Sequence, residues 1–167
     1  MKKEYSLSEI GLIEASITDY SFVYAEDIPL MLNERDTFVH KGNMGRARIF
    51  AGSYGMMGAA IICNKACINY GVGLLTAIVP QCGYNIIQTS VPEAMCITST
   101  EDKHIIWNEQ MYSNQTNAIA IGPGIGRLPE TEHLVKEVLQ SYNGKSIVID
   151  ADGLYHLSSL LKQGLKL

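Results

Sequence analysis

The sequence lacks long apolar stretches and blocks of like charge. Lys65 interrupts the longest apolar run, which leaves fewer than the roughly 20 uncharged residues that a transmembrane helix needs. The first 30 residues are polar with only short apolar runs, so we expect no signal peptide, no membrane partner and a cytoplasmic protein. Acidic and basic residues interleave at a formal net charge of −4, which argues against nucleic acid as a partner.

Cysteine pairs at zinc or redox spacing are also missing. The four cysteines, Cys63, Cys67, Cys82 and Cys96, lie in or beside apolar segments, and no two of them form a C-x-x-C motif. Free cysteine commonly behaves as a small apolar residue, so we expect buried thiols in a reducing compartment. The four histidines follow no ligand pattern, and the single Trp107 is expected to serve packing.

What the chain does contain is an alternation of strand and helix patterns, beginning near Lys41. With 167 residues and 47% hydrophobic content, it is large enough for one domain with a true core. Apolar spacing predicts helices over residues 56–70, 83–89 and 131–144. Strands are predicted at residues 47–51, 71–80, 91–99, the first part of 118–126, and 146–157. This alternation predicts an α/β fold with a largely parallel sheet.

Three turns follow predicted strands: "GSYGMMGA" (52–59), "GPGIG" (122–126) and "DADG" (150–153). Ligands of open parallel sheets bind beyond the carboxyl ends of the strands, and glycines let the backbone approach them closely. The first turn is not G-x-G-x-x-G, however, and it lacks the Walker lysine. Either glycine turn could simply connect a strand tightly to a helix.

Two acids end the last predicted strand. Asp150 and Asp152 are placed to hold a metal or a substrate hydroxyl, although the metal is not identified by any pattern. Asp152 could equally cap a helix that begins near Gly153. The residues themselves leave both interpretations open.

Taken in order, four segments are similar to a known family. "HKGNMGRARIFAGSYGMMGAAIICNKACINYGVGLLTAIVP", "VPEAM", "AIAIGPGIG" and "IVIDADGL" resemble the ADP- or ATP-dependent NAD(P)H-hydrate dehydratases of the ribokinase-like superfamily, over about residues 34–157. The resemblance implies a three-layer α/β/α fold with a mostly parallel sheet. It also implies a domain plan: residues 1–33 resemble the linker after an NAD(P)H-hydrate epimerase domain, and residues 34–167 the N-terminal portion of the dehydratase domain.

The resemblance further implies a reaction. Family members phosphorylate hydrated NADH or NADPH with ADP or ATP and Mg²⁺, then eliminate phosphate to restore the nicotinamide. The hydrated dinucleotide would contact four residues: Gly58, Ala59, Gly124 and Gly126. Three others would shape the wall of the site: Gly52, Ser53 and Asp150.

The resemblance also has departures. The family's His-Pro-Gly-Glu segment, its Lys-Gly strand and the Asn-Gly-Thr-Gly-Asp motif with the general base are not among these 167 residues, and Gly153-Leu154-Tyr155 stands where Ala-Leu-Asn is usual. We therefore expect a truncated dehydratase that is inactive alone, with no catalytic residue of its own. Its exposed sheet edge would require a homo-oligomer or a complementing C-terminal half. The alternatives are a non-catalytic dinucleotide-binding fragment and an incomplete sugar or vitamin kinase relative.

Overall fold

The computed structural model describes residues 24–31 and 37–166. Contacts divide the chain into two units, residues 1–37 and 38–167, which are described separately. In the first unit, a short helix α1 (Ile28–Met31) follows a turn in which the Tyr24 amide donates to the Asp27 carboxylate at 2.8 Å. Most of the segment predicted as a linker, residues 1–33, lies outside the described residues.

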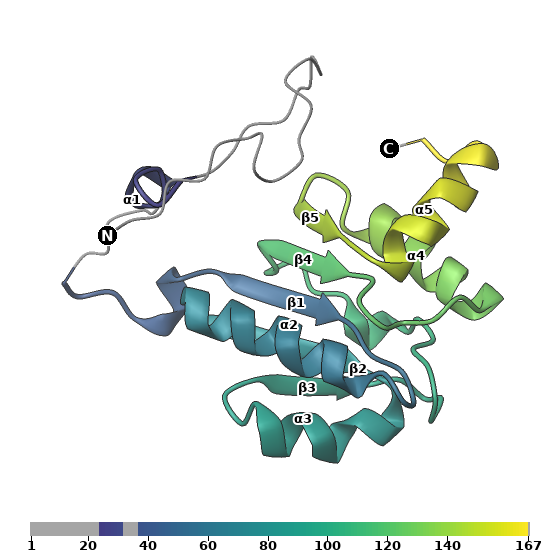
Figure 1. The fold of residues 1–167 in the computed structure, drawn as a ribbon, viewed down its shortest axis with the longest axis horizontal. Helices are drawn as coiled ribbons and strands as arrows, with labels where there is room; N and C mark the ends of the chain where they lie inside the picture. Colours follow the sequence, from purple (N-terminus) through teal and green to yellow (C-terminus); the bar gives the residue numbers. More distant parts are fainter. Residues whose placement is uncertain (1–23, 32–36, 167) are drawn as a thin grey trace, which may run out of the picture. The chain divides into compact units, whose positions relative to one another are not determined.

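The second unit is built on a five-stranded parallel sheet with the order β3-β2-β1-β4-β5 (Figure 1). All four neighbouring pairs of strands are parallel. The strands are β1 (Arg46–Phe50), β2 (Leu74–Val79), β3 (Met95–Thr98), β4 (Ala118–Ile121) and β5 (Ser146–Ile149). The helices are α2 (Met57–Tyr70), α3 (Tyr84–Ser90), α4 (Pro129–Ser141) and α5 (Asp152–Lys162), with 3-10 turns η1 (Lys41–Asn43), η2 (Gln81–Gly83) and η3 (Glu109–Met111).

Helices cover both faces of this sheet. On one face, α2 and α3 enclose a core of small and β-branched side chains that includes Ala60 and Ile87. On the other face, α4 and α5 enclose a core with larger side chains, among them Phe50, Leu134 and Tyr142. Because both faces are covered, β2 is buried over almost its full length. The α/β fold with a mostly parallel sheet is confirmed.

The structure differs from the prediction at two strands. The strand expected over 146–157 ends at Ile149, because from Asp152 onward the buried residues recur at helical spacing, with Gly153, His156 and Leu160 facing inward. The strand expected over 91–99 is shorter as well. It begins at Met95, after a turn in which the Ala94 amide donates to the Val91 carbonyl at 3.0 Å.

Candidate functional site

The strand order reverses between β1 and β4, and the turns that follow these two strands meet there. The chain runs from β1 outward to β3 on one side and then returns to place β4 on the other side of β1. The Gly52 amide donates to the Pro123 carbonyl at 2.9 Å, and the Ser53 hydroxyl donates to the Gly124 carbonyl at 2.8 Å. The reversal point of a parallel sheet is where such folds bind ligands. The two predicted glycine turns therefore form one continuous surface.

Backbone geometry explains why glycine occupies the second turn. Gly124 has a φ of +67°, and a Cβ at this position would lie 3.1 Å from the Ala59 Cβ and from the Met56 carbonyl oxygen. Gly124 thus packs directly against the beginning of α2. Gly58, in the first turn of α2, is exposed, with open space around its Cα. Of the predicted contacts, Ala59 and Gly124 touch this junction, and Gly58 lies on its open side.

The third predicted turn, "DADG", lies against the second. A Cβ on Gly122 would lie only 1.9 Å from the Asp150 carbonyl oxygen, so the end of β4 and the turn after β5 are in close contact. The Asp150 carboxylate is exposed and accepts the Ala151 amide at 2.7 Å. Its charge also raises the pKa of the Cys63 thiol, after the larger effect of burial, so it lies within electrostatic range of α2.

The capping interpretation of Asp152 is wrong. The helix begins at Asp152 itself, and Ala151 occupies the N-cap position without a side-chain cap. The Asp152 carboxylate turns instead toward the second glycine turn. It accepts the Gly126 amide at 3.1 Å and pairs with the Arg127 Nε at 2.9 Å.

Sequence reasoning missed His156. This side chain is 1% exposed, and its Nε2 lies 2.9 Å from the Gly126 carbonyl oxygen and 3.1 Å from the Thr131 hydroxyl. Its Nδ1 is buried without a hydrogen-bond partner, 4.0 Å from a carboxylate oxygen of Glu132. The signal that could have identified it was its place four residues after Asp152, which puts the two side chains on one helix face.

The loop after β3 is a further element that sequence reasoning missed. Its backbone carbonyls accept amides from two neighbouring turns: Glu101 accepts Gln81, Asp102 accepts Cys82, and Lys103 accepts Tyr54. The Lys103 ammonium lies 5.7 Å from the centre of the Tyr54 ring, and the Arg127 guanidinium lies 4.6 Å from that of Tyr155. The edge of the sheet that carries the glycine turns thus also carries two cation–aromatic pairs.

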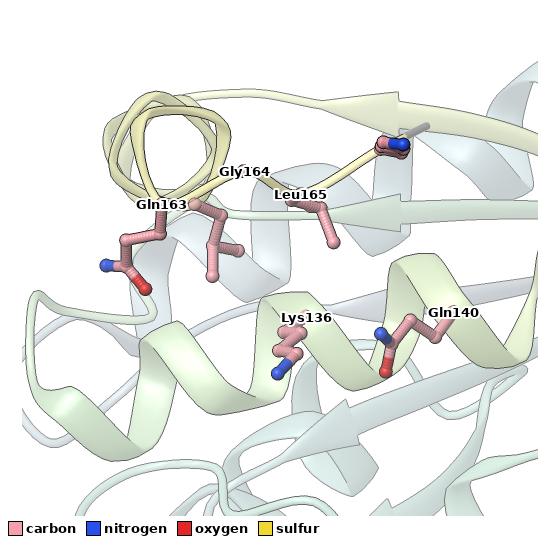
Figure 2. A pocket seen from close by; sticks show the side chains of 7 residues that line it. Lys136, Gln140, Gln163, Gly164 and Leu165 are labelled. Carbon is pink, nitrogen blue, oxygen red and sulfur yellow. The ribbon is translucent and has the colours of Figure 1, made fainter.

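Two cavities lie away from the three turns. One of about 410 Å³ lies between α4 and the segment after α5, and it is lined by residues that include Lys136, Gln140, Gln163 and Leu165 (Figure 2). Another, also about 410 Å³, lies beside β5. None of the residues that line these two cavities belongs to the three turns.

The described residues lack both a metal-ligand cluster and a membrane-spanning helix. In residues 24–31 and 37–166, no group of three or more His, Cys, Asp or Glu side chains is arranged to hold a metal ion. Within the same part of the chain, no helix is long and apolar enough to span a bilayer. All four cysteines are free thiols and half-buried rather than fully buried.

Comparison with known proteins decides the family. The family model described as NAD(P)H-hydrate dehydratase matches residues 47–165, which include all five strands except the first residue of β1, and all three turns. The chain belongs to the NAD(P)H-hydrate dehydratase family. A relative in Listeria monocytogenes, an ADP-dependent (S)-NAD(P)H-hydrate dehydratase, is 35% identical over 122 residues. That alignment covers 72% of this chain and 43% of the relative.

Other relatives include a longer bifunctional enzyme and proteins of known crystal structure. A bifunctional NAD(P)H-hydrate repair enzyme of Vibrio cholerae is 33% identical over 132 residues, covering 77% of this chain and 25% of that enzyme. A ribokinase-like superfamily protein from Enterococcus faecalis superposes with a TM-score of 0.72 at 26% identity, covering 85% of this chain and 52% of that one. The ADP/ATP-dependent dehydratase of Bacillus subtilis, co-crystallised with ATP and Mg²⁺, gives a TM-score of 0.62 at 27% identity, over 77% of this chain and 45% of that one.

These comparisons confirm the ribokinase-like fold and the family resemblance. The chain spans less than half of the length of the two curated relatives described above.

Proposed function

We propose that this chain provides the substrate-side wall of an NAD(P)H-hydrate dehydratase site. The predicted contacts of the hydrated dinucleotide are Gly58, Ala59, Gly124 and Gly126, with Gly52, Ser53 and Asp150 shaping the wall. The observation that carries the proposal is the pair of hydrogen bonds that joins the turns after β1 and β4, from Gly52 to Pro123 and from Ser53 to Gly124. A surface of small residues lets an anionic dinucleotide approach the backbone closely.

Within this proposal, the residues bind and orient rather than react. The first turn leads into the N-terminus of α2, where unpaired amides favour an anionic group such as the pyrophosphate of a dinucleotide. The small side chain of Ala59 and the missing side chains of Gly58 and Gly124 leave room for the ligand. Catalysis in phosphoryl transfer depends on such positioning together with charge stabilisation.

The described residues show no recognised pattern for binding ADP or ATP with Mg²⁺. The turn after β1 has no Walker lysine, and residues 24–31 and 37–166 contain no metal-ligand cluster of three or more side chains. We therefore assign no donor contact, and no phosphoryl-transfer step, to these residues. The relatives named above are ADP- or ATP-dependent, and we propose that the nucleotide is bound by other residues of the complete site.

Calorimetric titration with hydrated NADH tests the proposal. We expect binding to the wild-type chain and at least about a tenfold loss in Gly124→Ala, because the new Cβ would push against Ala59 and Met56. Gly144→Ala is the matched control, since Gly144 also has a positive φ (+80°) but open space around it. A chain that ignores hydrated NADH and binds a hydroxylated sugar or a pyrimidine would instead support a kinase relative.

Turnover separates a catalytic chain from a binding module. We expect no recovery of NADH by the purified chain with ADP and Mg²⁺, because these residues do not include the family's general base. Restored NADH absorbance would show that this expectation is wrong.

We also propose a partner for the free edge of β5. The strand order ends at β5, where Val148 is 65% exposed and Ile147 and Ile149 line a cavity. Unpaired strand edges pair readily with further strands. The occupant we propose is the C-terminal half of a dehydratase domain or a second copy of this chain. Both occupants would be contradicted if the chain sediments as a monomer, melts cooperatively and does not bind the C-terminal half when it is added.

A further inference from the structure

The turn between β5 and α5 contains a strained residue. Ala151 has φ 47° and ψ −123°, and among the residues that the structure describes it is the only non-glycine residue with a positive φ. Side chains rarely adopt this conformation, and it persists only where the surroundings hold it. Here it is held on both sides: Asp150 accepts the Ala151 amide, and Asp152 is bound to the second glycine turn.

Two side chains of α5 contact the backbone of Gly126, one at its amide and the other at its carbonyl. Asp152 accepts the Gly126 amide at 3.1 Å, and the His156 Nε2 lies 2.9 Å from the Gly126 carbonyl oxygen. The two side chains are one helical turn apart on one face of α5. Gly126 has a φ of +83°, and nothing lies within 4 Å of the position that a Cβ would take. Besides the two α5 side chains, the Thr131 hydroxyl donates to the Gly126 carbonyl at 3.1 Å.

Hydrogen-bond chemistry favours one tautomer of His156. A bond from the ring to the Gly126 carbonyl requires the proton on Nε2, whereas the other tautomer would accept the Thr131 hydroxyl at 3.1 Å, and we assign the proton to Nε2 on the shorter 2.9 Å distance to the carbonyl. In the neutral ring, Nδ1 is then a bare lone pair, buried and without a partner, 4.0 Å from the Glu132 carboxylate. A buried acceptor of this kind costs free energy that an apolar side chain would avoid. The polar ring is therefore kept for its bond to Gly126 and Thr131 rather than for packing.

We propose that Asp152 and His156 are positioning residues, which hold the Gly126 peptide in the orientation that receives the hydrated dinucleotide. This inference rests on the proposed function of the second glycine turn as substrate wall. Neither side chain is assigned a contact with the reacting atoms. If Asp152 and His156 only linked α5 to the start of α4, they would stabilise the fold without changing the affinity of the folded protein for hydrated NADH.

Hydrogen exchange of the Gly126 amide, measured in protein labelled at glycine, tests whether Asp152 holds this amide. Asp152→Ala removes the acceptor of the Gly126 amide, and we expect exchange of that amide to become about tenfold faster or more. Asp152→Asn keeps an acceptor oxygen and should restore slow exchange. The exposed Ser158→Ala on the same helix is the control. Unchanged exchange in Asp152→Ala would overturn the inference.

The ¹⁵N chemical shifts of the His156 ring test the second contact, between His156 and the Gly126 carbonyl. We expect His156 to carry its proton on Nε2, and His156→Gln, whose amide can still donate to the Gly126 carbonyl, to retain more of the wild-type Gly126 signal than His156→Leu does. A neutral ring with its proton on Nδ1 would overturn the assignment. If the His156→Leu variant fails to fold, His156→Gln can still be compared with the wild type.

Affinity for hydrated NADH distinguishes a positioning role of Asp152 and His156 from a purely structural one. We expect at least about a tenfold weaker Kd in Asp152→Ala, rescued in Asp152→Asn, with Ser158→Ala unchanged. Faster exchange of the Gly126 amide without any loss of affinity would overturn positioning. A wild-type chain that binds no hydrated NADH would contradict the proposed function, whereas amide exchange would still decide whether Gly126 is held.

Discussion

At the scale of single residues, Gly122 shows most clearly how close backbone contacts shape the site. It combines a φ of +131° with the approach of the Asp150 carbonyl oxygen, which would lie 1.9 Å from a Cβ. No side chain can fit there without separating β4 from the turn after β5. The glycine was identified in the sequence as part of "GPGIG", but the partner that excludes a side chain lies 28 residues further along the chain.

Gly122→Ala should therefore be severely destabilising. We expect a loss of at least about 3 kcal/mol in the free energy of unfolding, because strain and a backbone clash act together. Gly144→Ala, where only the positive φ matters, should cost about 1 kcal/mol. Urea denaturation of both variants measures the difference, and equal losses would show that the close approach to Asp150 does not matter.

Cys96 provides a second test at this scale. Burial raises the pKa of its thiol from 9.0 to about 11, so at pH 8 its thiolate fraction falls about a hundredfold. We expect Cys96 to be alkylated by iodoacetamide far more slowly in the folded chain than in urea. Mass spectrometry of timed digests measures the rate. Equal rates in the two states would contradict the burial of this thiol.

Residue identity predicted some of the candidate site but not its connections. The glycines and Asp150 stood out because their types and spacing carry chemistry. His156 did not, because a lone histidine in an apolar helix has no pattern, and only the three-dimensional contact with Gly126 gives it a role. For Asp152 the sequence left helix capping and ligand binding both open, because each is a common use of an aspartate after a strand, and only the structure shows its contacts with Gly126 and Arg127.

At the scale of elements, α4 and α5 are joined by a polar contact around Glu132. Hydrogen bonds from Ser159 and then from Gln163, with a smaller contribution from His156, lower the pKa of the Glu132 carboxyl below its ordinary value. The Gln163 amide donates to Glu132 at 3.0 Å. A carboxyl whose pKa is lowered by folding stabilises the fold above its unfolded pKa, and this contribution is lost as the pH falls through the folded pKa.

We expect this contact to contribute to acid sensitivity below about pH 4.5. Between pH 6 and pH 3, Glu132→Gln should lose less stability than the wild type, because it has no carboxylate to protonate. Ser159→Ala, which removes the strongest donor, should fall between them. Urea midpoints across this range measure the effect. Identical acid profiles for the wild type and Glu132→Gln would contradict the assignment.

The elements themselves were largely predictable from periodicity. Helices α2, α3 and α4 lie within a few residues of the expected ranges, because apolar spacing and glycine or proline breaks are local signals. The larger of the two errors came at β5, where an apolar run continued into α5. Strand and helix patterns overlap there, and the strained Ala151 that separates them has no signature in the sequence.

At the scale of the whole molecule, the core belongs to the second unit. Every residue of the two core clusters lies between Ala47 and Leu165. Strand order, by contrast, could not be worked out from the sequence, since alternation predicts parallel strands without saying which are neighbours. The family resemblance implied a ribokinase-like three-layer fold, which the comparisons confirm, but the order β3-β2-β1-β4-β5 comes from the structure.

Deleting residues 1–37 should therefore leave the fold intact. We expect residues 38–167 to keep the circular dichroism of the parent chain and to melt within a few degrees of it, because the described residues of both core clusters all lie between Ala47 and Leu165. Thermal melts of both proteins measure this. Loss of the cooperative transition would show that the first unit is needed for the core.

The central place of β1 also sets the order in which the sheet can form during synthesis. The chain from β1 to β3 is continuous and can pair as it leaves the ribosome, yet the other edge of β1 pairs with Ala118–Ile121, which is made much later. Until then the apolar side chains that will face α4, including Phe50 and Ile78, have no cover. That face of the sheet is therefore exposed until α4 (Pro129–Ser141) has been synthesised and packed, and the nascent chain is prone to aggregation over this interval.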